Sequence, residues 1–147
     1  MNLPDLAGTP WRAIILSERE GVWCLVDAID YPWLVESNWN VWHSGRARWQ
    51  LYAKRNVGVS RATVRMHREI LKRADPRPEA EIARLVGDHR NRCTLDNRRA
   101  NLRWTDHATN AANSGAFGSA PSVELVTAQL LAQLRREQPA ILEDVPF

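Results

Sequence analysis

Residues 85–113 read LVGDHRNRCTLDNRRANLRWTDHATNAAN, and this stretch decides the fold that the sequence predicts. Residues 85–89 are typical of a short strand that ends on two chemically active side chains, Asp88 and His89. A polar loop follows, and residues 102–104 return as a second strand. The stretch therefore predicts a strand, a loop, a strand and then a helix within one short segment.

The helix is expected over residues 107–114, because Asp106 is a good N-cap and Gly115 a typical stop. Helical spacing puts His107, Asn110 and Asn113 on adjoining turns of one face.

Asp88, His89 and Asn110 together suggest hydrolytic chemistry. Hard divalent cations prefer oxygen ligands, which the Asp88 carboxylate and the Asn110 amide could supply alongside water and a phosphate oxygen. His89 offers an imidazole able to take a proton from water near neutral pH. Such a set could hydrolyse a phosphodiester with Mg²⁺ or Mn²⁺, although an Asp-His pair can also be simple turn chemistry.

The order Gly-Asp-His, then Leu-Asp-Asn-Arg-Arg-Ala-Asn-Leu-Arg-Trp, then Asn-Ala-Ala-Asn resembles the His-Asn-His (HNH) endonucleases. The resemblance is to the phage- and intron-encoded homing type, which has a ββα-metal finger. It extends over roughly residues 12–113 and includes the tripeptide 66–68, Met-His-Arg.

The resemblance assigns roles to four residues. It implies that His89 is the general base and that Asn101 braces the loop and keeps His89 oriented. Asn110 stands at the third motif position, where many relatives have His, and would share one divalent metal with Asp88. His67 and His107 could take part, although packing for His67 and solvation for His107 are the favoured interpretations.

Charge is strongly segregated along the chain. Residues 46–103 contain 16 Lys+Arg against 6 Asp+Glu, a net +10, whereas both flanking segments are acidic. A basic block of this kind indicates a polyanionic partner, here double-stranded DNA, although it could also be an ordinary solvated face. The expected phosphate contacts are the arginines of the loop and second strand: Arg90, Arg92, Arg98, Arg99 and Arg103. Asp96 could instead pair with one of these arginines and shape the loop.

The remaining patterns predict an α+β fold. Residues 1–72 read as a β-rich region with strands over 12–17, 22–27, 39–42 and 49–55 and a short helix over 29–36. Residues 62–71 then read as a helix or as a strand–helix transition. A short helix is expected over 79–85, and residues 73–115 make up the proposed nuclease motif. Six of the seven Trp precede residue 50, and core packing is favoured over base stacking for them.

Residues 116–147 are expected to form a linker, a helix and a tail. Ser122 is of a residue type that caps helices, and an apolar stripe follows at helical spacing. The stripe consists of Val123, Val126, Leu130, Leu131 and Leu134. Docking of this helix onto the body is favoured over a homodimer or another protein partner.

The lengths of the apolar runs and the number of cysteines indicate in which compartment the protein is expected. No apolar run approaches the roughly 18 residues that a membrane span needs, and the first residues do not resemble a secretory signal. The two isolated cysteines, Cys24 and Cys93, suit a reducing cytoplasm, although a disulfide between them is conceivable. We therefore expect a cytoplasmic protein, in a bacterial host if a phage or mobile element encodes it.

Three functions are compatible with these patterns. The first is a metal-dependent DNA endonuclease that nicks or cuts both strands. The others are a DNA-binding module that kept the scaffold without turnover, and an accessory phage protein that acts through the C-terminal helix.

Overall fold

The computed structural model describes residues 1–45, 50–114 and 120–138 and has a mixed α+β fold. A first antiparallel pair, β1 (Trp11–Ser17) and β2 (Val22–Asp27), is followed by the one-turn helix α1 (Tyr31–Leu34). The two strands agree with the prediction, but α1 is shorter than the predicted helix over 29–36.

A second antiparallel sheet consists of β3 (Asn40–Ser44), β4 (Gln50–Val57) and β5 (Ala62–Arg65). The chain passes from β5 directly into helix α2 (Met66–Ala74), as the predicted transition over 62–71 requires. Four side chains of α2 are buried, and the fully buried Met66 and Ile70 each contribute roughly 1.5–3 kcal/mol to stability. Helix α2 is therefore anchored in the core at the junction between the sheets.

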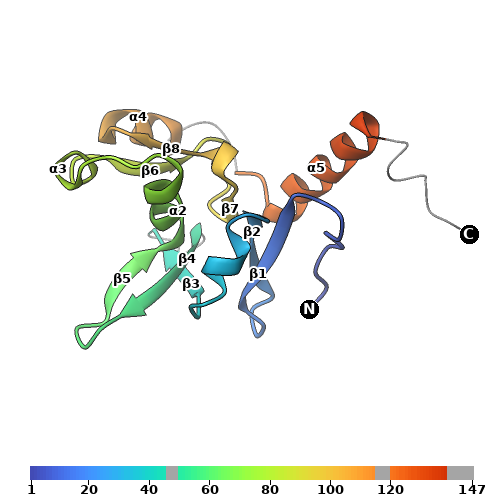
Figure 1. Ribbon diagram of the computed structural model, residues 1–147, viewed down its shortest axis with the longest axis horizontal. Helices are drawn as coiled ribbons and strands as arrows, with labels where there is room; N and C mark the ends of the chain where they lie inside the picture. The colour runs from blue at the N-terminus through green and yellow to red at the C-terminus, as the bar shows by residue number, and fades with distance from the viewer. Residues whose placement is uncertain (46–49, 115–119, 139–147) are drawn as a thin grey trace, which may run out of the picture.

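The decisive stretch forms the elements that its pattern predicts. After the short helix α3 (Glu79–Ile82), strand β6 (Val86–His89) pairs antiparallel with β8 (Leu102–Thr105), and helix α4 (His107–Ser114) follows. Figure 1 shows β6, β8 and α4 on one side of α2 and the β3–β4–β5 sheet on the other. Asp106 caps α4, because its Oδ1 accepts a hydrogen bond from the Thr109 N–H at 2.7 Å.

The loop between β6 and β8 contains two elements that the sequence did not predict. Asp96 and Asn97 form β7, which pairs in parallel with β2 through Leu25 and Val26. A 3₁₀ turn, η1 (Arg99–Asn101), then leads into β8. The loop is thereby fixed to the N-terminal sheet.

One hydrophobic core joins the N-terminal strands to the β6–β8 unit, since Ile14, Val26, Leu102 and Trp104 belong to the same buried cluster. Trp39 is buried in this cluster and Trp23 in a second one, so these tryptophans fill the core as expected. Cys24 and Cys93 are buried free thiols rather than a disulfide.

Helix α5 (Val123–Glu137) docks onto the body of the molecule. The Ser122 hydroxyl accepts a hydrogen bond from the Leu125 N–H at 3.1 Å, which confirms the predicted cap. Val123 and Val126 are buried against Leu6, Trp23 and Leu25, so the docked arrangement is the one observed. In the part of the chain that the structure describes, no helix is both long and apolar enough to span a membrane.

Candidate functional site

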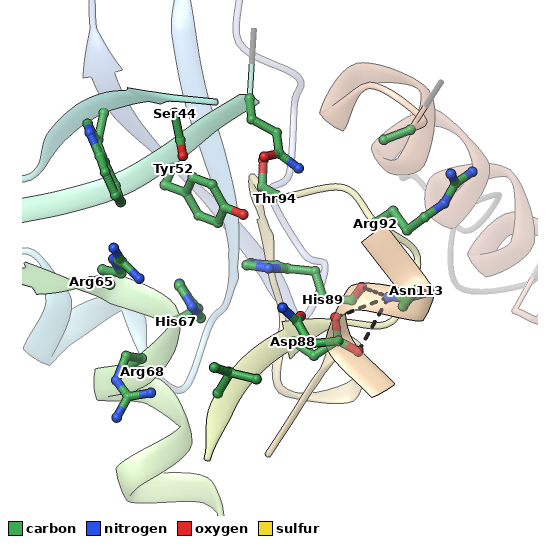
Figure 2. Close-up of a pocket in the computed structure, with 16 residues that line it drawn as sticks. Ser44, Tyr52, Arg65, His67, Arg68, Asp88, His89, Arg92, Thr94 and Asn113 are labelled. Atoms are coloured by element: carbon green, nitrogen blue, oxygen red, sulfur yellow. Dashed lines mark hydrogen bonds between the residues drawn. The ribbon is translucent and has the colours of Figure 1, made fainter. Parts of the chain in front are cut away.

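A cavity of about 280 Å³ opens where β4, the start of α2, the end of β6 and α4 meet. Figure 2 shows its side chains, with His89 between Tyr52 and His67 on one side and Asp88 and Asn113 on the other. Its polar and aromatic lining residues include Trp42, Tyr52, Arg65, His67, Arg68, Asp88, His89, Arg92, Asn110 and Asn113. Among these described residues, Asp88 is the one acidic group, so the lining is basic overall.

His89 lies at the end of β6 with only 4% of its surface exposed. Its Nε2 is 2.8 Å from Oδ1 of Asn97, while Nδ2 of Asn97 faces the Met66 sulfur at 3.4 Å. Because an amide oxygen only accepts, Nε2 donates to it and the basic lone pair resides on Nδ1. Burial lowers the pKa of the imidazole below its ordinary value, so the ring is neutral at pH 7 and can accept a proton.

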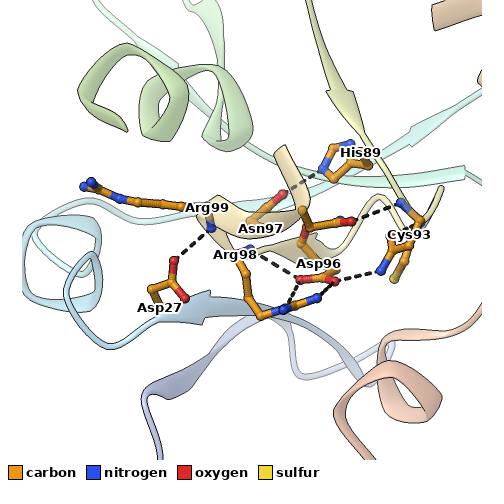
Figure 3. Close-up of polar contacts among 9 residues, drawn as sticks. Asp27, His89, Cys93, Asp96, Asn97, Arg98 and Arg99 are labelled. Carbon is orange, nitrogen blue, oxygen red and sulfur yellow. Dashed lines mark hydrogen bonds and ion pairs between the residues drawn. The ribbon is translucent and has the colours of Figure 1, made fainter. Parts of the chain in front are cut away.

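Asn97 is positioned by the strand β7, which attaches the loop to β2. The neighbouring Asp96 is fully buried, and its carboxylate accepts hydrogen bonds from Nε and Nη2 of Arg98 at 2.9 and 2.8 Å. Nδ2 of Asn91 also donates to Asp96, at 2.8 Å. Figure 3 shows this set of contacts around the loop. Asp96 therefore shapes the loop by pairing with an arginine, which is the alternative that the sequence left open.

Asn101 braces the same loop. Its Oδ1 accepts a hydrogen bond from the Asn91 N–H at 3.0 Å, and its Nδ2 donates to the Asp96 carbonyl at 2.8 Å. The bracing thus agrees with the expectation, but the amide that contacts the His89 ring belongs to Asn97. The sequence leaves Asn97 open between ordinary loop chemistry and a functional role, because its contact depends on the unpredicted strand β7.

Asp88 is buried beside His89, and its carboxylate is hydrogen-bonded from two directions. Nε of Arg103, the residue opposite Asp88 on β8, donates to Oδ2 at 2.8 Å. Nδ2 of Asn113 lies 3.1 and 3.3 Å from the two oxygens and 3.1 Å from the His89 carbonyl. Asn113 therefore connects α4 to the end of β6, a role that the sequence did not assign.

Helix α4 also brings Asn110 to the cavity, one turn before Asn113. Asp88, His89 and Asn110 consequently line the same space, as the sequence predicts. His107, on the first turn of the helix, is exposed and lies outside the described residues that line the cavity, which agrees with a solvated role.

Three of the five arginines expected to contact DNA have structural carboxylate partners. Arg98 binds Asp96, Arg103 binds Asp88, and Arg99 donates through Nε and Nη2 to the fully buried Asp30 at 2.9 and 2.7 Å. In the structure these three guanidinium groups form ion pairs within the fold. Arg92 lines the cavity, and Arg90 is exposed in the loop.

His67 packs in the interior, as the sequence favours for it, and it also lines the candidate site. The residue is 4% exposed and lines the cavity, with its ring centroid 4.8 Å from that of His89. Burial, and then the neighbouring His89, lower its pKa well below the ordinary value. Gly87 makes room for it, since a Cβ there would lie 2.7 Å from Cδ2 of His67.

Two of the side chains that line the cavity carry oxygen donors. Asp88 and Asn110 offer carboxylate and amide oxygens, the ligands that Mg²⁺ and Mn²⁺ prefer, and Mg²⁺ usually retains several waters beside one or two carboxylates. Within residues 1–45, 50–114 and 120–138, no three His, Cys, Asp or Glu side chains gather into a metal cage.

Comparisons of the chain with models of protein families, with curated proteins and with solved structures found no match.

Proposed function

We propose that the protein is a metal-dependent DNA endonuclease of the HNH type that hydrolyses phosphodiester bonds. The observation that supports this most is the convergence of Asp88, His89 and Asn110 on one basic cavity. The residue order that resembles HNH enzymes and the strand–loop–strand–helix arrangement of β6, β8 and α4 support the same interpretation.

The proposed base is Nδ1 of His89. The Asn97 amide accepts from Nε2 and so fixes both the tautomer and the ring orientation. Burial favours the neutral imidazole, which can take a proton from a water molecule as that water attacks phosphorus. The bond between phosphorus and the sugar oxygen breaks, and that oxygen takes a proton from solvent water and leaves as a hydroxyl. One strand is cut for each encounter with a single site.

Asp88 and Asn110 would hold one Mg²⁺ or Mn²⁺, which would neutralise charge developing on the phosphate and on the leaving oxygen. Asn113 and Arg103 fix the Asp88 carboxylate at the end of β6. The guanidinium groups of Arg65, Arg68 and Arg92 line the cavity and would attract the phosphate that enters it. The chain therefore supplies the base, the oxygen ligands and the phosphate contacts.

The test is nicking of supercoiled plasmid in a series of divalent metals, with chelator as the blank. Wild-type protein should convert supercoiled to nicked DNA in Mg²⁺ or Mn²⁺, and His89→Ala should lower the rate by roughly 10²-fold or more while DNA binding is retained. His43→Ala is the matched control, because His43 pairs with Glu20 on the surface at 2.8 Å. An unchanged cutting rate in His89→Ala would refute the assignment of the base.

A second candidate is a DNA-binding module without turnover. The specific observation in its favour is that Arg103 and Asn113 already hydrogen-bond the Asp88 carboxylate. Salt-dependent DNA binding by wild-type protein that leaves the plasmid supercoiled in every metal would favour this candidate.

A further inference from the structure

A second basic cavity adjoins the candidate site. It has a volume of about 300 Å³ and shares Arg65 and Arg68 with the first cavity. Its other lining residues are Thr63, Val64, Glu69 and Lys72, at the end of β5 and along α2. The two arginines thus form the boundary between the space beside His89 and a groove that continues along α2.

Both guanidinium groups are oriented by tryptophans. Cζ of Arg65 lies 4.5 Å from the ring centroid of Trp42, and Cζ of Arg68 lies 5.0 Å from that of Trp104. Nη1 of Arg68 also donates to the Leu85 carbonyl at 3.2 Å. Stacking uses the face of a guanidinium and leaves N–H groups at its edge for an anion, which suits phosphate recognition.

The two cations are close enough to oppose one another. The pKa of Arg68 is lowered by burial and then by the positive charge of Arg65. Within the described ranges, neither guanidinium has an ion-pair partner, whereas Arg98, Arg99 and Arg103 each bind a carboxylate. The acidic Glu69 in the groove is 3.4 Å from Lys72 and is partly neutralised by it. Glu69 and Glu79 act on Arg68 only at longer range than an ion pair. Two arginines without an ion-pair partner in the described part of the chain, beside a basic cavity, are better suited to binding an anion than to stabilising the fold.

We propose that Arg65 and Arg68 bind the backbone phosphates of DNA next to the phosphate that enters the His89 cavity. The inference rests on the proposed function and defines where the substrate strand lies: from the cavity, past the two arginines, toward Lys72 on the next turn of α2. The contacts would orient the strand without reading its sequence. The DNA-binding arginines would then differ from Arg98, Arg99 and Arg103.

The experiment measures binding of a labelled DNA duplex by fluorescence anisotropy over a salt series without divalent metal. Variants are Arg65→Gln, Arg68→Gln and the double variant, and Arg136→Gln, an exposed position on α5, is the matched control. Removing one arginine–phosphate interaction should reduce the slope of log affinity against log salt by about one. Near 0.1 M salt this corresponds to roughly eightfold weaker binding for each single variant and roughly 60-fold for the double variant.

Arg136→Gln should keep the wild-type slope, and thermal unfolding verifies that every variant is folded. If Arg68→Gln unfolds because its hydrogen bond to Leu85 is missing, the exposed Arg65→Gln variant alone provides the test. Wild-type slope and affinity in Arg65→Gln would overturn the proposal.

Plasmid nicking separates the two hypotheses. If the arginine variants have altered salt slopes but wild-type protein does not nick the plasmid, the arginine contacts are supported and the nuclease is refuted. If wild-type protein nicks the plasmid but the variants keep the wild-type salt slope, only the arginine contacts are refuted.

Discussion

Asn97 accepts a hydrogen bond from Nε2 of His89 at 2.8 Å, although eight positions separate the two residues and the amide is 1% exposed. The contact exists because β7 attaches the loop to β2 and turns the Asn97 side chain toward the end of β6. The tautomer of the candidate base is therefore set from within the loop.

Asn97→Asp should raise the pKa of His89, because a carboxylate beside an imidazole favours the charged ring. The base must be neutral to accept a proton, so the acidic limb of the pH–rate profile for nicking should move to higher pH. The shift can be measured directly by NMR titration of the His89 ring. Asn38→Asp, at an exposed position, is the matched control and should leave the titration unchanged. An unchanged His89 titration in Asn97→Asp would contradict the role of this amide.

Gly87→Ala should disturb the second histidine. The added Cβ would lie 2.7 Å from Cδ2 of His67 and 3.2 Å from Cδ1 of Leu71, so the His67 ring must move. Overpacking of this kind typically costs about 1–3 kcal/mol, which urea unfolding would measure. The double variant Gly87→Ala/His67→Ala should lose less stability than the two single changes together, since the clash disappears with the ring. If the losses in free energy of unfolding of the two single variants simply add in the double variant, the ring of His67 does not require the glycine.

Low pH should destabilise the protein through the buried rings of His67 and His89. Burial lowers the pKa of both His67 and His89, so below pH 6.5 the unfolded chain binds protons that the folded chain resists. The contribution of the two histidines to the free energy of unfolding is therefore fully present above pH 6.5. It declines as the pH falls below that value, by up to about 1.4 kcal/mol per pH unit for each histidine that stays neutral in the folded chain. Thermal unfolding between pH 7.5 and 5 would show the decline.

His67→Gln should flatten this pH dependence, whereas His107→Gln, on the exposed first turn of α4, should leave it unchanged. An equally steep decline in His67→Gln would mean that other groups cause the acid sensitivity.

Local pattern is enough to predict much of this fold. The strands of the first hairpin, the β5–α2 transition, the β6–β8–α4 order and the caps Asp106 and Ser122 all depend on residues close in sequence. The pairing of β7 with β2 joins Leu25 to Asp96, and no periodicity within two residues can signal such a strand.

The same reason explains which site contacts the sequence does not predict. Arg99 reads as a DNA contact because its partner Asp30 is 69 positions away, and His67 reaches His89 only through the packing of α2 on β6. Asp88, His89 and Asn110, by contrast, lie within one compact motif whose elements form as predicted, so their shared cavity can be anticipated.

Arg99→Ala should act on stability rather than on DNA affinity. Asp30 is fully buried, and its carboxylate accepts from Arg99 as well as from the Trp33 indole at 2.9 Å. The Arg99 side chain is 34% exposed, so water screens the pair in part, and its loss should cost about 1–3 kcal/mol because the buried carboxylate loses a hydrogen-bonding partner. Urea unfolding should reveal the loss, and Asp30→Asn in the same chain should restore part of it. Weakened DNA binding with unchanged stability would instead place Arg99 at the DNA interface.

The Asp88 carboxylate is shared between a proposed cation and Arg103, and the two should compete. Arg103→Gln removes the positive charge 2.8 Å from Oδ2 and should therefore tighten Mn²⁺ binding, measured by calorimetry with the full chain. Asp88→Asn should weaken Mn²⁺ binding and abolish nicking, yet strengthen DNA binding in chelator, because a negative charge leaves a cavity that receives phosphate. Arg77→Gln is the control for Arg103→Gln, since its partners Asp75 and Glu81 lie on the surface and outside the lining of the cavity. Identical Mn²⁺ affinity in wild type, Arg103→Gln and Asp88→Asn would show that this carboxylate binds no metal, and the cation would have to be removed from the proposed mechanism.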